Sequence, residues 1–139
     1  MLSGRLPPAD LTVEELRQRS WWSGPEAYVV VDDYDLVAAG MENPMGPLAE
    51  YLAQARDLGL HVLLARRTGG ASRALFEPVL IALKDLNTQG ILLNGDPQEG
   101  SLLGDHRPER LRAGRGVLVR RNQGVPVQVA WVPPEGTLT

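Results

Sequence analysis

Two uninterrupted apolar runs stand out against the mixed hydrophobic and polar pattern of the chain. Residues 27–31 (AYVVV) end abruptly in Asp-Asp-Tyr-Asp, and residues 60–65 (LHVLLA) end in Arg-Arg-Thr-Gly-Gly. Apolar runs without alternation are typical of strands that are buried on both faces, as in a parallel sheet. The pattern therefore predicts two buried strands, each ending in polar residues.

A short helix is expected ahead of the first strand. Thr12 is followed three residues later by Glu15, which is the spacing of a capping box. The pattern predicts a helix over 13–19, and the Trp-Trp-Ser-Gly-Pro sequence that follows ends it. We interpret this region as a lead-in to the core.

A longer helix is expected between the two strands. Asn43 and Pro44 fit an N-cap with proline at the first helical position. Apolar residues recur at helical spacing over 45–55, and Gly59 stands where a helix should stop. The pattern predicts one helix that crosses from the first strand to the second.

The second half of the chain continues the alternation of helices and strands. A proline breaks its helical part, and a Gly-containing turn joins its last two strands. The predicted elements are helical pieces over 71–76 and 78–86 that are broken at Pro78, a short strand over 91–93, and hairpin strands over 116–121 and 125–131 around residues 122–124.

This order of elements predicts an α/β fold with helical crossovers. At 139 residues the chain has the length of one domain. We therefore expect a single domain over 1–139. It would comprise a lead-in helix and linker over 1–24, an α/β core over 25–134 and a tail over 135–139.

Composition and charge exclude several classes of function. The sequence has no cysteine, which removes disulfide scaffolds, thiol nucleophiles and thiolate metal sites. Neither a run of 18 apolar residues nor the apolar core of a signal peptide is present, so we expect a cytosolic segment without membrane insertion. The formal net charge of −3 argues against nucleic acid as a partner.

The carboxylates after the first strand are the first candidates for chemistry. In open α/β sheets, ligands bind beyond the carboxyl ends of the strands. Asp32 and Asp33 follow an apolar strand, as in a Walker B element, where the first carboxylate holds the Mg²⁺ of a nucleotide. The alternative is that both carboxylates only cap the next turn.

The arginines after the second strand are the second candidates. A parallel neighbour would bring Arg66 and Arg67 close to Asp32, and their guanidinium groups suit a phosphate or a sensor role. Residues 68–70 (TGG) leave the backbone room to approach a ligand. The alternative is a structural bridge from arginine to aspartate. No G-x-x-x-x-G-K-[ST] occurs, so the phosphate cradle of a P-loop is missing from this sequence.

Other polar and aromatic residues carry weaker signals. His61 lies inside an apolar run and is interpreted as a core or strand-end histidine, and His106 has no second histidine at ligand spacing, so no metal site is expected. The arginine cluster over 105–124 could attract nucleic acid or an acidic neighbour, or form a solvated hairpin face. The tryptophans could anchor a partner or seal a sheet edge. These residues are His61 and His106; Arg107, Arg110, Arg112, Arg115, Arg120 and Arg121; and Trp21, Trp22 and Trp131.

Several longer motifs make the sequence specific. The motifs are WWSGP at 21–25, VVVDDYDLV at 29–37, QARDLGLH at 54–61, ARR at 65–67, RALFEPVL at 73–80, LLG at 102–104 and GRG at 114–116. With them, nearly the whole chain, from about Gly4 to Pro134, resembles the C-terminal, third ATPase domain of the EccC proteins, the FtsK/SpoIIIE-type motors of bacterial type VII (ESX) secretion.

The resemblance implies a RecA-like P-loop NTPase fold, with a mostly parallel sheet, flanking helices and a C-terminal β-hairpin. The P-loop half would precede residue 1. Asp32 would be the Walker B aspartate and hold Mg²⁺ through water. Asp33 stands where active motors of this type have a catalytic glutamate, and its side chain is one methylene shorter, which would weaken hydrolysis. Arg66 and Arg67 would be sensor residues.

The resemblance also implies partners and cofactors. The domain would bind the C-terminal signal of small WXG-type substrates, and would bind ATP and Mg²⁺ when complete, with weak or no hydrolysis; the isolated chain would bind neither cofactor. Its partners would be the upstream ATPase domains and further copies in a hexamer, at the cytoplasmic face of the cell membrane. The alternatives are an autonomous ATPase and an FtsK-like DNA-translocating module. Candidate anchors for the signal are Leu36, Val37, Met41, Leu102 and Leu103.

Overall fold

The computed structural model describes residues 2–40 and 42–130. The chain divides into two compact units, Met1–Arg66 and Arg67–Thr139, and each is described by itself. The prediction of one domain over the whole chain stays a prediction. No helix among the described residues has both the length and the apolar character needed to cross a membrane.

The first unit begins with the 3₁₀ helix η1 (Ser3–Arg5) and helix α1 (Val13–Gln18). The predicted capping box is present: the Thr12 hydroxyl oxygen accepts from the backbone N–H of Glu15 at 3.3 Å, and the Glu15 carboxylate accepts from the backbone N–H of Thr12 at 2.9 Å. The hydrogen bond from the Thr12 side chain holds the pKa of Glu15 below its usual value. Local sequence therefore determines where α1 begins.

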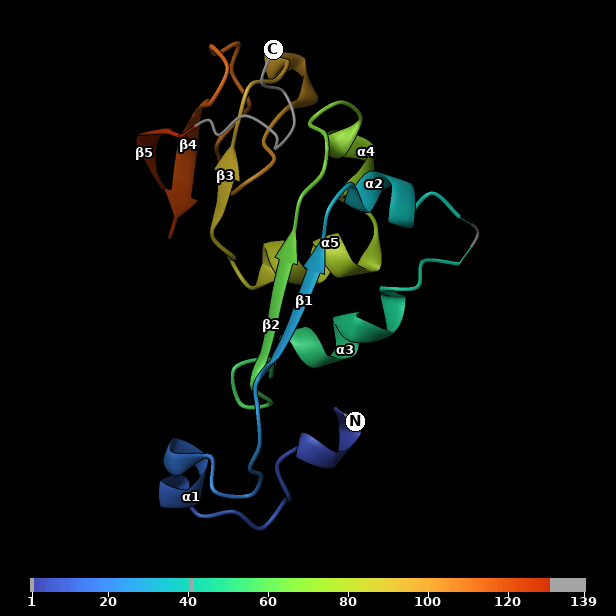
Figure 1. Cartoon of the computed structure of the whole chain (residues 1–139), viewed down its shortest axis with the longest axis vertical. Helices are drawn as coiled ribbons and strands as arrows, with labels where there is room; N and C mark the ends of the chain where they lie inside the picture. Colours follow the sequence, from blue (N-terminus) through green and yellow to red (C-terminus); the bar gives the residue numbers. More distant parts are fainter. Residues whose placement is uncertain (1, 41, 131–139) are drawn as a thin grey trace, which may run out of the picture. The chain divides into compact units, whose positions relative to one another are not determined.

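Strands β1 (Ala27–Val31) and β2 (Leu60–Leu64) form the predicted parallel pair, with Ala27 opposite Leu60 and Val31 opposite Leu64 (Figure 1). The prediction that both faces are buried was wrong. Tyr28, Val30 and Leu63 are 65%, 71% and 53% exposed. Alternate positions of β1 are half-buried, so the described residues cover one face of this pair and leave the other open.

The connection from β1 to β2 contains α2 (Tyr34–Val37), the 3₁₀ helix η2 (Gly46–Leu48) and α3 (Ala49–Leu52). The Asn43 side chain accepts from the N–H of Met45 at 2.9 Å, but η2 begins at Gly46 with Met45 as its N-cap residue, so the prediction of Asn43 as the N-cap was wrong. The predicted helix is nevertheless shorter, because after Leu52 the backbone continues as turns. The N–H groups of Gln54, Ala55 and Asp57 bond the carbonyls three residues back.

The core of the first unit lies around this connection. Its buried apolar side chains are Tyr34, Leu52, Leu58 and Leu60, with Tyr34 and Leu58 almost fully buried. The Tyr34 hydroxyl accepts from the Asn43 side-chain amide at 2.8 Å, and the Tyr34 N–H donates to the carbonyl of Ala65 at 2.8 Å. Tyr34 thus ties α2 to the carboxyl end of β2.

The second unit has the two predicted helical pieces, α4 (Ala71–Ala74) and α5 (Pro78–Asp85). The break at Pro78 is confirmed. The Glu77 carboxylate accepts from the N–H groups of Val79 and Leu80, so it caps α5. Further along the chain lies a 3₁₀ helix, η3 (Pro97–Glu99).

The sheet of the second unit is antiparallel, in the order β3 (Gly90–Leu92), β4 (Arg115–Arg120), β5 (Gln123–Gln128). The hairpin is confirmed, but its turn is at Arg121 and Asn122, with φ of 50° and 60°, as a two-residue type I′ turn requires. The expectation of a mostly parallel sheet is corrected for the described strands. They form one parallel pair and a separate three-stranded antiparallel sheet.

Candidate functional site

The carboxylates after β1 lie at the surface. The parallel ladder continues past the strand, because the N–H of Ala65 donates to the carbonyl of Val31 at 2.9 Å, so the backbones of Asp32 and Ala65 run side by side. Both aspartates are exposed, and an Asp32 carboxylate oxygen accepts from the N–H of Asp33 at 3.0 Å. Asp33 is the N-cap residue of α2, with φ of 49°, but its side chain makes no capping bond. Of the two carboxylates, only that of Asp32 therefore accepts a backbone bond near the turn, as the capping alternative requires, and that of Asp33 does not.

The arginines after β2 belong to different units. Arg66 is half-buried and is the last residue of the first unit, whereas Arg67 is exposed and opens the second. Arg66 directly follows Ala65, the last residue whose N–H bonds the backbone at the end of β1. Of the two candidate sensors, the structure therefore brings Arg66 to the same strand end as Asp32.

A magnesium ion fits this strand end only in part. Within residues 2–40 and 42–130, no three His, Asp or Glu side chains gather so that they could hold a metal ion. Mg²⁺ is usually bound by one or two carboxylates together with water and substrate phosphates. The exposed Asp32 supplies the right donor for that arrangement, and the remaining ligands would come from a nucleotide and water.

The glycines of residues 68–70 have open space beside their backbone, since a Cβ added at Gly69 or Gly70 would meet no atom within 4 Å. The Glu99 carboxylate accepts from the N–H of Gly70 at 2.7 Å, and from the N–H and hydroxyl of Ser72 at 3.2 and 2.9 Å. An internal carboxylate thus already takes the N–H of Gly70.

The candidate anchors for a peptide fall into both units. Leu36, on α2, is 63% exposed, and Val37 is half-buried. Leu102 and Leu103 are half-buried in the second unit, and a Cβ added at Gly90 would meet the Leu103 side chain at 2.7 Å. Leu103 is therefore already used in packing against β3. Met41 lies outside the described residues.

The remaining polar candidates are at the surface. All six clustered arginines are exposed, and Arg110 lies 3.9 Å from Asp96. His61 is half-exposed near the start of β2 and pairs with Glu26 at 2.9 Å, which lowers the pKa of the Glu26 carboxyl. His106 bonds the carbonyl of Asn122 at 3.2 Å.

Two tryptophans and a buried arginine form contacts that the sequence did not reveal. Trp21 and Trp22 are half-buried, and their indole N–H groups donate to the carbonyls of Arg5 and Asp57. Arg5, a single arginine in the lead-in with no motif around it, is one of the few buried charged residues. Its role had no signal in the sequence; Trp131 lies outside the described residues.

Known proteins are similar to the chain over nearly its whole length. EccC4, an ESX-4 secretion system protein of Mycobacterium tuberculosis, is 56% identical over 135 residues, which is 96% of this chain and 11% of that protein. The ESX secretion system protein EccC of Thermomonospora curvata is 51% identical over 123 residues, 88% of this chain and 9% of that protein. The chain thus spans about a tenth of the length of these relatives. No protein-family model matches it.

Solved structures agree with this similarity. The cytoplasmic domain of the Thermomonospora curvata type VII secretion ATPase EccC matches with a TM-score of 0.89 and 48% identity, over 96% of this chain and 16% of that one. The same TM-score and identity are found for Thermomonospora curvata EccC, ATPases 2 and 3, in complex with a signal sequence peptide, over 96% of this chain and 24% of that one.

The mixed α/β fold and these matches define a segment of a secretion ATPase. More particularly, the chain belongs to the EccC ATPases of type VII (ESX) secretion systems, of which it corresponds to one part.

Proposed function

We propose that this chain is the part of a type VII secretion ATPase that binds the signal sequence of secreted substrates, within the third, C-terminal ATPase domain. One observation carries the proposal: a solved EccC structure in complex with a signal sequence peptide matches 96% of this chain at 48% identity. The substrates would be small WXG-type proteins, recognised through a C-terminal helical segment.

Exposed apolar side chains support peptide binding by this chain. An amphipathic helix docks through apolar anchors three or four residues apart, and a few anchors dominate the binding energy. Leu36 is open to solvent and adjoins the half-buried Val37, so these two residues of α2 are the anchors that we favour. Leu103 is a poorer choice because it packs against β3, and Leu102 precedes it in the same loop.

The carboxyl end of β1 and β2 is proposed to hold a nucleotide in the complete domain, which would have the RecA-like fold. Asp32 would hold Mg²⁺ through water, Asp33 would occupy the position of the catalytic base, and Arg66 and Arg67 would sense the phosphates. Bound Mg²⁺ neutralises charge on the phosphate oxygens. Because the sequence has no P-loop, the phosphate cradle would come from another part of the polypeptide, and this chain by itself would bind neither ATP nor Mg²⁺ appreciably.

The assembly proposed for the complete protein follows from its family. The chain would act together with upstream ATPase domains of the same motor, and copies of the motor would form a hexamer at the cytoplasmic face of the membrane. The alternative, a DNA-translocating module, has less support because the net charge is −3.

Fluorescence anisotropy with the labelled Thermomonospora curvata signal sequence peptide tests the binding proposal. We expect micromolar affinity, since two or three buried anchors of about 1.5–3 kcal/mol each suffice for it after the cost of ordering the peptide. Apolar contacts dominate, so the affinity should change little between low and high salt. A scrambled peptide should not bind.

Two substitutions of exposed side chains make the test specific. Leu36→Ser should weaken binding about tenfold, which corresponds to the loss of one anchor. Phe76→Ser is the matched control, because Phe76 is 82% exposed and lies in the other unit. Absence of binding at about 100 μM protein, or binding that high salt abolishes, would count against the proposal.

A further inference from the structure

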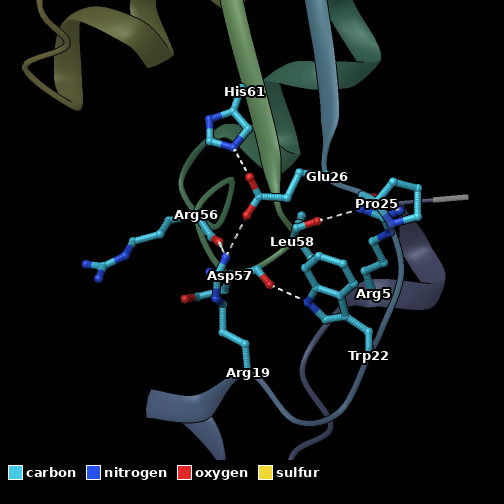
Figure 2. Close-up of polar contacts among 9 residues, drawn as sticks. All are labelled: Arg5, Arg19, Trp22, Pro25, Glu26, Arg56, Asp57, Leu58 and His61. Atoms are coloured by element: carbon cyan, nitrogen blue, oxygen red, sulfur yellow. Dashed lines mark hydrogen bonds and ion pairs between the residues drawn. The ribbon is translucent and has the colours of Figure 1, made fainter.

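Three consecutive carbonyls in the turn before β2 each accept a hydrogen bond from a different side chain of the lead-in segment (residues 2–24) (Figure 2). Arg19 donates to the carbonyl of Arg56 at 2.8 Å, and Trp22 donates to that of Asp57 at 2.7 Å. Arg5 donates to the carbonyl of Leu58 at 3.1 Å. The carbonyl of Arg56 also accepts from the backbone N–H of Gly59 at 3.3 Å, whereas a turn that has left the helix provides no such partner for those of Asp57 and Leu58.

The Arg5 guanidinium joins the amino ends of both strands. Besides the carbonyl of Leu58, it bonds the carbonyl of Pro25 at 2.9 Å. Pro25 stands two residues before β1, and Leu58 stands two residues before β2. Because the first residues of the two strands are paired, one planar group spans the pair at the point where its register begins.

Burial makes Arg5 the principal contact of the lead-in segment. Arg5 is only 8% exposed, and its guanidinium carbon lies 4.4 Å from the centroid of the Trp22 ring. The stacked ring and the two carbonyls together replace the water that the charged group has lost. Removal of the guanidinium would leave both carbonyls without this donor.

A second bridge between the strands lies beside the first and is exposed. The Glu26 carboxylate pairs with His61 at 2.9 Å and with Arg19 at 3.5 Å, and the ring of Tyr28 stacks on that of His61. The side chains of Glu26, His61 and Arg19 are each about 40% exposed. Exposed ion pairs contribute little to stability. This second bridge is therefore secondary to the buried contact of Arg5.

Helix α1 itself contributes little buried surface to the unit. It has no buried residue, and its apolar side chains Val13 and Leu16 are 67% and 41% exposed. The lead-in segment is therefore held to the strands by the side chains of Arg5, Arg19 and Trp22, and Figure 2 shows these three converging on one turn. This attachment is made largely by hydrogen bonds, and it lies against the buried residues Leu58 and Gly59.

We propose that the lead-in segment is a strap that closes on the amino ends of β1 and β2 and holds their register. Its opening loosens the parallel pair as far as the carboxyl end, where Ala65 bonds Val31 and Asp32 follows. The strap is a conformational device of this fold, and it does not depend on the binding of a peptide or a nucleotide.

Amide hydrogen exchange of the 139-residue chain, followed by NMR, tests the strap. Two backbone N–H groups report on the pair, Ala27, bonded to Gly59, and Ala65, bonded to Val31, and a third, Leu60, bonded to Ala55, reports on the turn before β2. In Arg5→Ala all three should exchange at least tenfold faster, together with the indole N–H of Trp22. The matched control Arg17→Ala changes an exposed arginine of α1 and should leave all rates within twofold.

Arg5→Lys keeps the test decisive if Arg5→Ala fails to fold. Lysine retains the positive charge beside Trp22 but lacks the planar fork that bonds two carbonyls at once. In Arg5→Lys the N–H groups of Ala27 and Ala65, at the two ends of the pair, should exchange faster than in the unchanged chain, but by less than tenfold. Unchanged exchange at Ala65 in Arg5→Lys and Arg5→Ala, or equal effects of Arg17→Ala, would overturn the proposal.

Discussion

Replacement of Tyr34 by alanine should lower the free energy of unfolding of the first unit by about 3–5 kcal/mol, the cost of removing a large buried aromatic side chain. Tyr34 is 1% exposed, the lowest value among its core neighbours apart from Leu58. Its hydroxyl also accepts from the Asn43 side-chain amide at 2.8 Å, a bond that alanine cannot make. The loss is a large fraction of the stability of a small domain.

Urea denaturation followed by tryptophan fluorescence measures this change. The background Trp131→Phe leaves Trp21 and Trp22, both in the first unit, as the only fluorescent indoles. The control Tyr34→Phe retains the ring and loses only the hydroxyl that accepts from Asn43, so it should cost about 1 kcal/mol. Equal effects of the two substitutions would contradict the burial of this ring.

Replacement of Gly59 by alanine should cost about 2–5 kcal/mol, for two separate reasons. Gly59 has φ of 59°, a left-handed conformation that costs a residue with a Cβ about 1–2 kcal/mol. A Cβ there would also lie 2.5 Å from the Trp22 ring, so the ring must move, and overpacking of this kind costs about 1–3 kcal/mol.

A double-mutant cycle separates the two costs of Gly59→Ala. In a Trp22→Ala background the clash with the ring is gone and only the exposed, movable Glu26 side chain lies close, at 3.2 Å, so Gly59→Ala should cost mainly the conformational part, about 1–2 kcal/mol. Unfolding in urea, followed by circular dichroism, provides all four free energies of the cycle. A penalty that stays the same with and without the Trp22 ring would show that the ring does not pack over Gly59.

The sequence predicted the elements that depend on local signals. The capping box at Thr12, the strand over 27–31, the break at Pro78 and the final hairpin are each specified by residues close together in the chain. The length of the helix before Gly59 was overestimated, because apolar spacing does not show that the backbone turns after Leu52. Periodicity therefore gave the type of each element better than its bounds.

Features that depend on distant residues were predicted less well. Burial of β1 on both faces was inferred from its apolar run, but burial depends on what covers the strand, and Tyr28 and Val30 are exposed. The turn at Arg121 and Asn122 could not be distinguished from one at Gly124, because asparagine and glycine both suit positive φ, whereas arginine at positive φ gave no signal. The contact of Arg5 with residues 25 and 58 links segments that no local pattern connects.

The candidate site was predicted by position, and the roles of its residues stay predictions. Asp32 and Arg66 follow neighbouring strands, as the parallel arrangement requires. By contrast, the N–H of Gly70 donates to Glu99, which lies 29 residues further along the chain. Spacing along the sequence can place a residue at a strand end, but it does not reveal which internal group reaches that residue.

NMR titration of the ¹⁵N-labelled chain tests the central claim most directly, with the Thermomonospora curvata signal sequence peptide in one series and Mg-ATP in the other. The account predicts saturable chemical-shift changes with the peptide, at a micromolar midpoint and centred on residues 34–37 of α2, and no change with Mg-ATP up to about 1 mM. Micromolar binding of Mg-ATP, or unchanged spectra with the peptide at about 100 μM, would contradict it.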